Sequence, residues 1–226
     1  MELTYFGHAT FQIDTGTRTV LFDPFLEGNP HTDTTPDELD PDVILVSHPH
    51  ADHFADTEAL VAQGDPLVIG TFEVITHVQE QFGHETVHPL NEGGQLDFPW
   101  GHVEAVHARH TASFPDGSYG GVPIGFVVDF GEMTVYYTGD TAPFMEMQWI
   151  GQDYDVDLMI APVGDVVTMG IPGALRAAAM VNPDTIMPIH YDTFPFIETD
   201  LSEFTDAAEQ AGFETLVVDF DDTVAL

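Results

Sequence analysis

The sequence contains no cysteine and no lysine, and only three of its 226 residues are basic. Without cysteine there is no disulfide, no thiolate metal ligand and no cysteine nucleophile, so a metal site would use nitrogen and oxygen ligands. The N-terminus has no basic segment followed by an apolar one, and no apolar run approaches the ~18 residues of a membrane-spanning helix. We therefore expect a soluble, unprocessed, cytoplasmic protein with no membrane partner.

The sequence has 39 acidic residues and three basic ones, Arg18, Arg109 and Arg176, which gives a formal net charge of −36. The acids are spread among apolar runs, and 43% of the residues are hydrophobic, so we expect one globular domain covering residues 1–226. At 1 M salt, charge repulsion is screened within about 3 Å, which indicates a halophilic protein of a salt-rich cytoplasm. The charge also argues against nucleic acid as a partner. A homo-oligomer remains open.

The segment Ser47–His53 organises the chain. Its ligating side chains His48, His50, Asp52 and His53 lie within six positions, directly after the apolar run Val43–Val46, which is typical of a short buried strand. In extended backbone, residues two apart point the same way, so His48 and His50 can share one ion. The alternative, a polar surface loop that happens to hold three histidines, does not account for the apolar strand before it. The pattern predicts a metal-binding loop at a strand end.

This spacing resembles the metallo-β-lactamase superfamily, and later positions supply that family's further ligands in order. His110, Asp140 and His190 each follow an apolar, strand-like run. The resemblance implies a first triad, a second triad and a bridging residue: His48, His50 and His110; Asp52, His53 and His190; and Asp140.

Four other segments resemble the ascorbate-phosphate-lactonase-like branch of metal-dependent hydrolases: Gly7–Thr10, Leu21–Phe25, Pro162–Gly170 and His190–Pro195. By this resemblance His8 and Asp23 lie near the metals, outside direct coordination. For His8 the alternative is a turn histidine that faces solvent. Tyr191 and Asp165 become candidate substrate contacts.

Arg109, next to the expected ligand His110, allows two interpretations. It could orient an anionic substrate. Neighbouring strand residues point to opposite faces, however, so it could equally face away and pair with an acid. The related family commonly has an aromatic residue here, which argues against a shared role.

Strands that end in ligands alternate with helices, and an αββα sandwich of four layers, in the mixed α/β (α+β) class, accommodates this order with every ligand loop along one edge. The expected strands are 3–6, 10–14, 19–22, 43–46, 67–70, two within 95–107, 124–129, 133–137, 157–161, 185–189 and 215–218. The expected helices are 56–62, 71–82, 143–150, 174–181 and 201–211.

Two divalent ions about 3.5–4 Å apart can share a water, lower its pKa and present hydroxide as a nucleophile. We expect Zn²⁺, with Mn²⁺ as the alternative. Asp52, Asp140 and His8 are the candidate catalytic residues. Asp140 would fix the metal separation, and the leaving group would be protonated by His8, by Tyr191 or by a water.

The expected substrate is a small-molecule ester, lactone or phosphodiester. His50 stands where a flavodiiron oxygen reductase has glutamate, which favours hydrolysis over redox chemistry. Two alternatives remain: a non-catalytic metal-binding protein of the same fold, and a phosphodiesterase that acts on nucleic acid.

Overall fold

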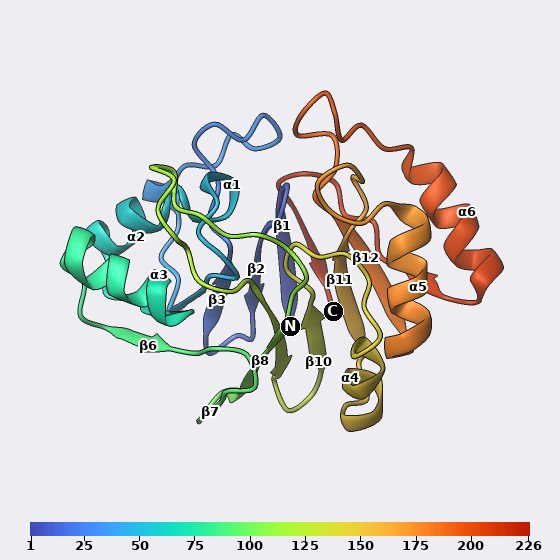
Figure 1. The fold of residues 1–226 in the computed structure, drawn as a ribbon, viewed down its shortest axis with the longest axis horizontal. Coiled ribbons are helices and arrows are strands. Elements are labelled where there is room, and N and C mark those ends of the chain that lie inside the picture. The colour runs from blue at the N-terminus through green and yellow to red at the C-terminus, as the bar shows by residue number, and fades with distance from the viewer.

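Two seven-stranded sheets pack face to face in the computed structural model, which describes residues 1–226 (Figure 1). In spatial order, the first sheet contains β14 (Asp222–Ala225), β1 (Glu2–Gly7), β2 (Thr10–Asp14), β3 (Thr19–Phe22), β4 (Val43–Leu45), β5 (Leu67–Gly70) and β6 (Val87–Pro89). The second contains β13 (Glu214–Thr215), β12 (Thr185–Ile189), β11 (Leu158–Pro162), β10 (Thr134–Tyr137), β9 (Ile124–Asp129), β8 (Gly101–His107) and β7 (Gln95–Phe98).

Strand direction explains why residues far apart in the sequence meet. The strands β1, β3 and β4 run the same way, because β2 is antiparallel to both β1 and β3 while β4 is parallel to β3. In the second sheet β8, β10, β11 and β12 also share one direction. Since the carboxyl ends of parallel strands lie at one edge of a sheet, the loops that follow these strands gather along that edge.

Helices cover the outer face of each sheet, which confirms the predicted αββα order (Figure 1). The first sheet is covered by α1 (Ala51–Phe54), α2 (Thr57–Gln63) and α3 (Phe72–His77), with a 3₁₀ turn at Pro36–Glu38 and a π turn at Val78–Phe82. The second is covered by α4 (Met147–Asp153), α5 (Ile171–Val181) and α6 (Leu201–Ala211). None of these helices combines the length and apolarity that a membrane crossing requires.

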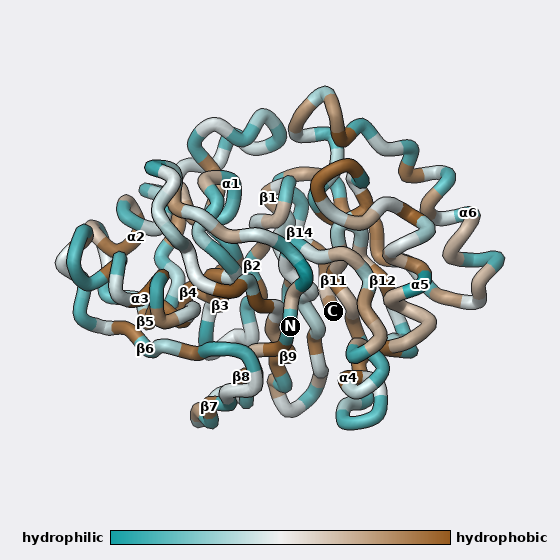
Figure 2. Tube along the Cα trace, in the orientation of Figure 1, coloured by the Kyte–Doolittle hydropathy of each residue, from teal (hydrophilic) through white to brown (hydrophobic).

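The main core cluster contains 41 buried residues and runs through both sheets. At its centre Phe11 and Phe22 stack with ring centroids 4.3 Å apart, and Tyr137 of the facing sheet meets them edge-on. Alternate residues of the strands point into this layer, and Figure 2 shows the hydrophobic segments concentrated there. A second cluster of 13 residues joins the first sheet to α2 and α3.

Several element boundaries differ from the sequence-based expectation. Strand β14 was not expected: its residues are largely exposed, and it is held by backbone pairing with β1 and by a 2.8 Å contact between the hydroxyls of Thr4 and Thr223. Helix α4 begins at Met147 instead of at residue 143, because residues 144–146 form a turn. The three- and four-residue spacing of Phe72, Ile75, Val78 and Phe82 predicts a core face for this helix. Phe72, however, is 59% exposed at the start of α3.

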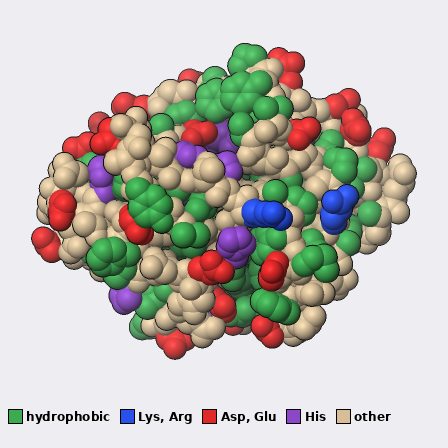
Figure 3. All heavy atoms as spheres, in the orientation of Figure 1, with side chains coloured by type: hydrophobic (Ala, Val, Ile, Leu, Met, Phe, Trp, Pro, Cys, Tyr) green, Lys and Arg blue, Asp and Glu red, His purple; other side chains and the backbone are tan.

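Acidic side chains are scattered over the visible face of the molecule, where basic side chains are few (Figure 3). The one arginine ion pair joins Arg18 to Asp42 at 3.1 Å, and both side chains are exposed. Such a pair contributes little, at most about 1 kcal/mol. Almost none of the carboxylate repulsion is therefore offset by internal pairing.

This charge excess predicts that the folded state requires molar salt. At 0.01 M ionic strength the screening length grows to about 30 Å, so the carboxylates repel one another across the whole molecule. Dialysis from molar salt into dilute buffer should remove most of the far-ultraviolet circular dichroism, and restoring the salt should recover it. A spectrum unchanged in dilute buffer would contradict this prediction.

Candidate metal centre

Loops at the carboxyl edge of the two sheets bring all of the expected metal-binding residues together with His8, which was expected near the metals but outside direct coordination. His8 follows β1, His48 to His53 follow β4, His110 follows β8, Asp140 follows β10 and His190 follows β12. His8 and His190 have φ angles of 53° and 56°. A left-handed conformation at a non-glycine residue turns the chain sharply and is common where a side chain must be aimed at a site.

The first expected triad is close enough to share an ion. The ligand atoms of His48, His50 and His110 lie within 4.8 Å of one another. The Nδ1 atom of His48 is 3.0 Å from the Ser47 hydroxyl, so its Nε2 atom faces the other two imidazoles. His48 is fully buried, whereas the His110 side chain keeps 13% exposure. His50 is also partly exposed, so the triad opens to solvent on the side of His50 and His110.

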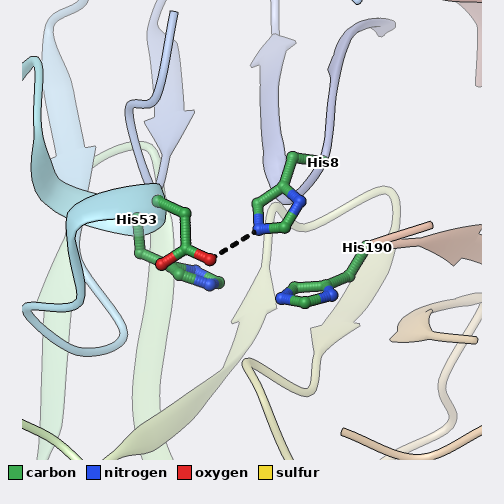
Figure 4. A group of neighbouring side chains, drawn as sticks. His8, His53 and His190 are labelled. Atoms are coloured by element: carbon green, nitrogen blue, oxygen red, sulfur yellow. Dashed lines mark hydrogen bonds and ion pairs between the residues drawn. The ribbon is translucent and has the colours of Figure 1, made fainter. Parts of the chain in front are cut away.

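A fourth side chain, that of His8, lies with the second expected triad. The ligand atoms of His8, Asp52, His53 and His190 also lie within 4.8 Å of one another. Figure 4 shows these side chains converging, and its dashed line is the 3.2 Å contact between His8 Nε2 and an Asp52 oxygen. The other His8 nitrogen is 2.9 Å from the hydroxyl of Thr193. His8 is fully buried, so the solvent-facing alternative is wrong.

Asp140 lies between the two groups. One of its oxygens is 3.3 Å from His53 Nε2 and 3.1 Å from His190 Nε2, both in the second group. The same oxygen is 3.6 Å from His110 Nε2 in the first group. This is the placement that a carboxylate bridging two ions requires.

Several buried polar atoms in the cluster have no hydrogen-bond partner. They are Nε2 of His53, both ring nitrogens of His190 and one oxygen of Asp140. A buried polar atom left unpaired costs about 1–3 kcal/mol. The Nε2 atoms of His53 and His190 lie 3.3 and 3.1 Å from the same Asp140 oxygen without hydrogen bonding to it, which favours a ligand among these three side chains. Imidazole nitrogen and carboxylate oxygen suit Zn²⁺ and similar divalent ions, and the residues therefore fit a metal centre.

A buried carboxylate, Asp23, orients this cluster from behind. It accepts hydrogen bonds from the Ser47 backbone at 2.7 Å, the Ser47 hydroxyl at 2.5 Å, the Tyr137 hydroxyl at 2.5 Å and His53 Nδ1 at 2.8 Å. A proton held on Nδ1 leaves Nε2 of His53 as the ligating atom. The sequence indicated Asp23 but gave no signal for Ser47 or Tyr137 as its partners.

The Beta-lactamase superfamily domain matches residues 2–190. This chain belongs to the β-lactamase superfamily. Among its relatives in the superfamily is a "UPF0173 metal-dependent hydrolase" of Salinibacter ruber, 59% identical over 226 residues that cover 100% of both chains. A Thermus thermophilus protein of the same description is 42% identical over 214 residues, 95% of this chain and 94% of its own.

A solved structure supports the same assignment. The chain resembles Igni18, described as a metallo hydrolase from the archaeon Ignicoccus hospitalis, with a TM-score of 0.90 and 30% identity. The similarity covers 99% of this chain and 97% of that chain. The family expected from the sequence is thereby confirmed.

In this member of the superfamily, two of the three expected substrate residues lie away from the cluster. Arg109 is exposed and lines a separate cavity of about 630 Å³ with Glu104 and Trp149, where it forms no ion pair. Tyr191 is 3% exposed and packs on Tyr5 in the core, where burial raises its pKa to about 12. Neither residue therefore faces the ligand atoms.

The third expected substrate residue, Asp165, is exposed at the start of the hairpin of residues 164–170. That hairpin is tied to the metal loops, because the Met169 amide donates to the carbonyl of Thr141, next to Asp140, at 3.0 Å. Asp165 is outside the ligand groups but on a segment that borders them.

Burial sets the charge of the first triad. Desolvation lowers the pKa of His48, His50 and His110, so these imidazoles are neutral at pH 7, the form that binds metal. For Asp140, burial alone would raise the pKa, but His190 and His53 lower it well below its usual value. The Asp140 carboxylate is therefore ionised.

This geometry predicts about two divalent ions per chain after reconstitution with Zn²⁺ or Mn²⁺ at high salt. Elemental analysis should show at most one ion in Asp140→Ala, because the shared ligand is lost, and the same loss in His110→Ala. The matched control is His88→Ala, an exposed imidazole on the edge strand β6, which should keep the full metal content. Absence of metal from the unmodified protein would contradict the assignment.

Proposed function

We propose that this metal-dependent hydrolase binds two divalent ions, Zn²⁺ or Mn²⁺, and hydrolyses a small-molecule ester, lactone or phosphodiester in a salt-rich cytoplasm. The observation that carries the proposal is the set of buried, unpaired ligand atoms on His53, Asp140 and His190. The family supports the reaction class, since the relatives are named metal-dependent hydrolases.

Two bound divalent ions would supply an activated water and polarise the scissile oxygen. His48, His50 and His110 would hold one of them, and Asp52, His53 and His190 the other. Asp140, in contact with both groups, would set their separation. In ester hydrolysis the water oxygen joins the carbonyl carbon, the acyl C–O bond breaks, and one proton passes to the leaving alkoxide.

His8 has its two ring nitrogens engaged, one by Thr193 and the other by Asp52. This arrangement suits a residue that positions the Asp52 carboxylate. It leaves His8 no free nitrogen for protonating a leaving group, so a water is the better candidate for that step.

The alternatives are weaker on physical grounds. A nuclease that acts on polyanions needs basic contacts, whereas this chain has no lysine and a net charge of −36. A non-catalytic binding protein has no need of seven converging ligands together with the Asp23 network behind them. The non-catalytic alternative is an outcome of the experiment below.

The direct experiment is a panel of lactones, carboxylic esters and phosphodiesters at high salt. Turnover of at least one class should disappear after chelation and return when Zn²⁺ or Mn²⁺ is added, because the water is activated by the ions. Hydrolysis that survives complete removal of metal would refute the proposal. Metal binding without any turnover would favour the non-catalytic alternative.

His8→Ala should keep most of its bound metal but lose about 10–100-fold in kcat, because Asp52 loses the imidazole that orients it. His8→Asn, which can still donate to Asp52, should recover part of the loss. Metal content and kcat measured together separate the possibilities: loss of an ion in His8→Ala would make His8 a ligand instead of a positioning residue.

A further inference from the structure

Aromatic rings lead without a gap from the metal ligands to the surface. The His8 ring lies 3.9 Å, centroid to centroid, from His190 and 5.5 Å from Phe194. Phe194 in turn stacks on Phe196 at 5.5 Å with only 9° between the ring planes. Phe196 is 54% exposed. An apolar surface therefore begins beside the cluster and ends in solvent.

Hydrogen bonds hold these phenylalanines in place. The buried Ile197 donates its amide to the Phe194 carbonyl at 3.0 Å and accepts from the Asp192 amide at 2.9 Å. The Asp192 side chain in turn accepts from the Thr199 amide at 2.7 Å. The rings are presented on a tied turn, so their exposure is a fixed feature of the fold.

The hairpin of residues 164–170 adds a second apolar wall. Its first residue, Gly164, packs so closely that a Cβ there would lie 2.2 Å from the His190 carbonyl oxygen and 3.0 Å from Ile197. The hairpin therefore lies against the turn that carries the phenylalanines. Near its tip Val166 is 69% exposed and Val167 46%.

Val166 also has a strained backbone, with φ of 57°. For a β-branched residue this conformation is an outlier that costs about 1–3 kcal/mol, and such strain is typically kept at functional sites. A glycine would avoid the strain but would remove the isopropyl group from the tip of the hairpin. The hairpin therefore presents an exposed hydrophobic side chain at a cost in backbone energy.

The charge of the hairpin and of the turn that carries the phenylalanines limits what can bind between them and the metal ligands. The segments 164–170 and 190–199 contain no lysine or arginine, but they carry Asp165, Asp192 and Glu198. Figure 3 shows hydrophobic side chains at the top of the molecule next to the visible imidazoles, with the basic side chains farther away. These carboxylates would repel an anionic substituent, and no cation is present there to balance its charge. A neutral apolar group would not be repelled.

We propose that Phe194, Phe196, Val166 and Val167, here called the apolar rim, bind the hydrocarbon substituent of a neutral carboxylic ester or lactone. The inference rests on the proposed dinuclear hydrolase and narrows its substrate. The metal cluster binds the reacting carbonyl group, and the rim selects the chain attached to it. Each methylene that the rim fully covers should increase affinity about fourfold.

Alkyl hydroxamates test the rim by binding instead of turnover, because the hydroxamate group chelates the ions and the tail extends toward the surface. Titration calorimetry on the Zn²⁺-loaded protein should show octanohydroxamate binding at least tenfold more tightly than acetohydroxamate. The octanoyl chain ending in a carboxylate, as the monohydroxamate of octanedioic acid, should lose most of that gain.

Phe196→Ser and Val166→Gly should each reduce the octano-to-aceto affinity ratio at least threefold while leaving acetohydroxamate binding unchanged. The second variant relieves strain, so it should fold at least as well as the parent. The control is Trp149→Ser, which removes an aromatic ring of similar exposure on α4 and should keep the full ratio.

The outcomes separate the two proposals. The rim proposal would be wrong if acetohydroxamate bound normally but the longer tail added no affinity. It would also be wrong if the added affinity survived Phe196→Ser and Val166→Gly. Either result would leave the metal site intact. An equal gain from the carboxylate-ended tail would overturn the preference for a neutral group. Failure of acetohydroxamate to bind would refute the metal chemistry, and the rim proposal would fail with it.

Discussion

The buried carboxylate of Asp23 is the constraint on which the site depends. It follows β3 in the first sheet, yet it accepts a hydrogen bond from Tyr137 in the second, so it ties the two sheets together at the edge where the ligands gather. The same carboxylate holds Ser47 and His53 on either side of the metal loop. Removing it would leave these buried groups unpaired and would free the loop that carries four ligands.

Strand direction then explains how ligands more than a hundred residues apart meet. Each expected ligand follows a short apolar run, and the structure arranges these runs as parallel strands with their carboxyl ends at one edge. The position of Asp140 was foreseeable for this reason, since it directly follows the strand that contains Tyr137. The apolar runs and the residues that follow them, together with the family resemblance, were enough to predict the fold and which of these side chains meet.

Side-chain direction after a strand was not foreseeable. His190 has a φ of 56°, which turns the chain so that its ring enters the cluster while Tyr191 packs into the core. A sequence gives no signal for that choice, so Tyr191 resembled a site residue. His8 differs from Tyr191, because it is a turn residue whose side chain does enter the site. Its contact with Asp52, 44 positions further along the chain, places it among the expected ligands. Strand β14 was not recognisable in the sequence, because backbone pairing with β1 holds it and few of its side chains are buried.

The charge of the chain and the proposed recognition mode are physically compatible. In molar salt the screening length is about 3 Å, so long-range attraction of a charged substrate would be lost. Contact with an apolar surface has the opposite dependence, because salts that are excluded from protein surfaces strengthen hydrophobic burial. A chain with three arginines, none of them on the segments that carry the rim, has little means of holding an anion there. In molar salt, the exposed rings of the proposed apolar rim would therefore provide a form of recognition that salt does not weaken.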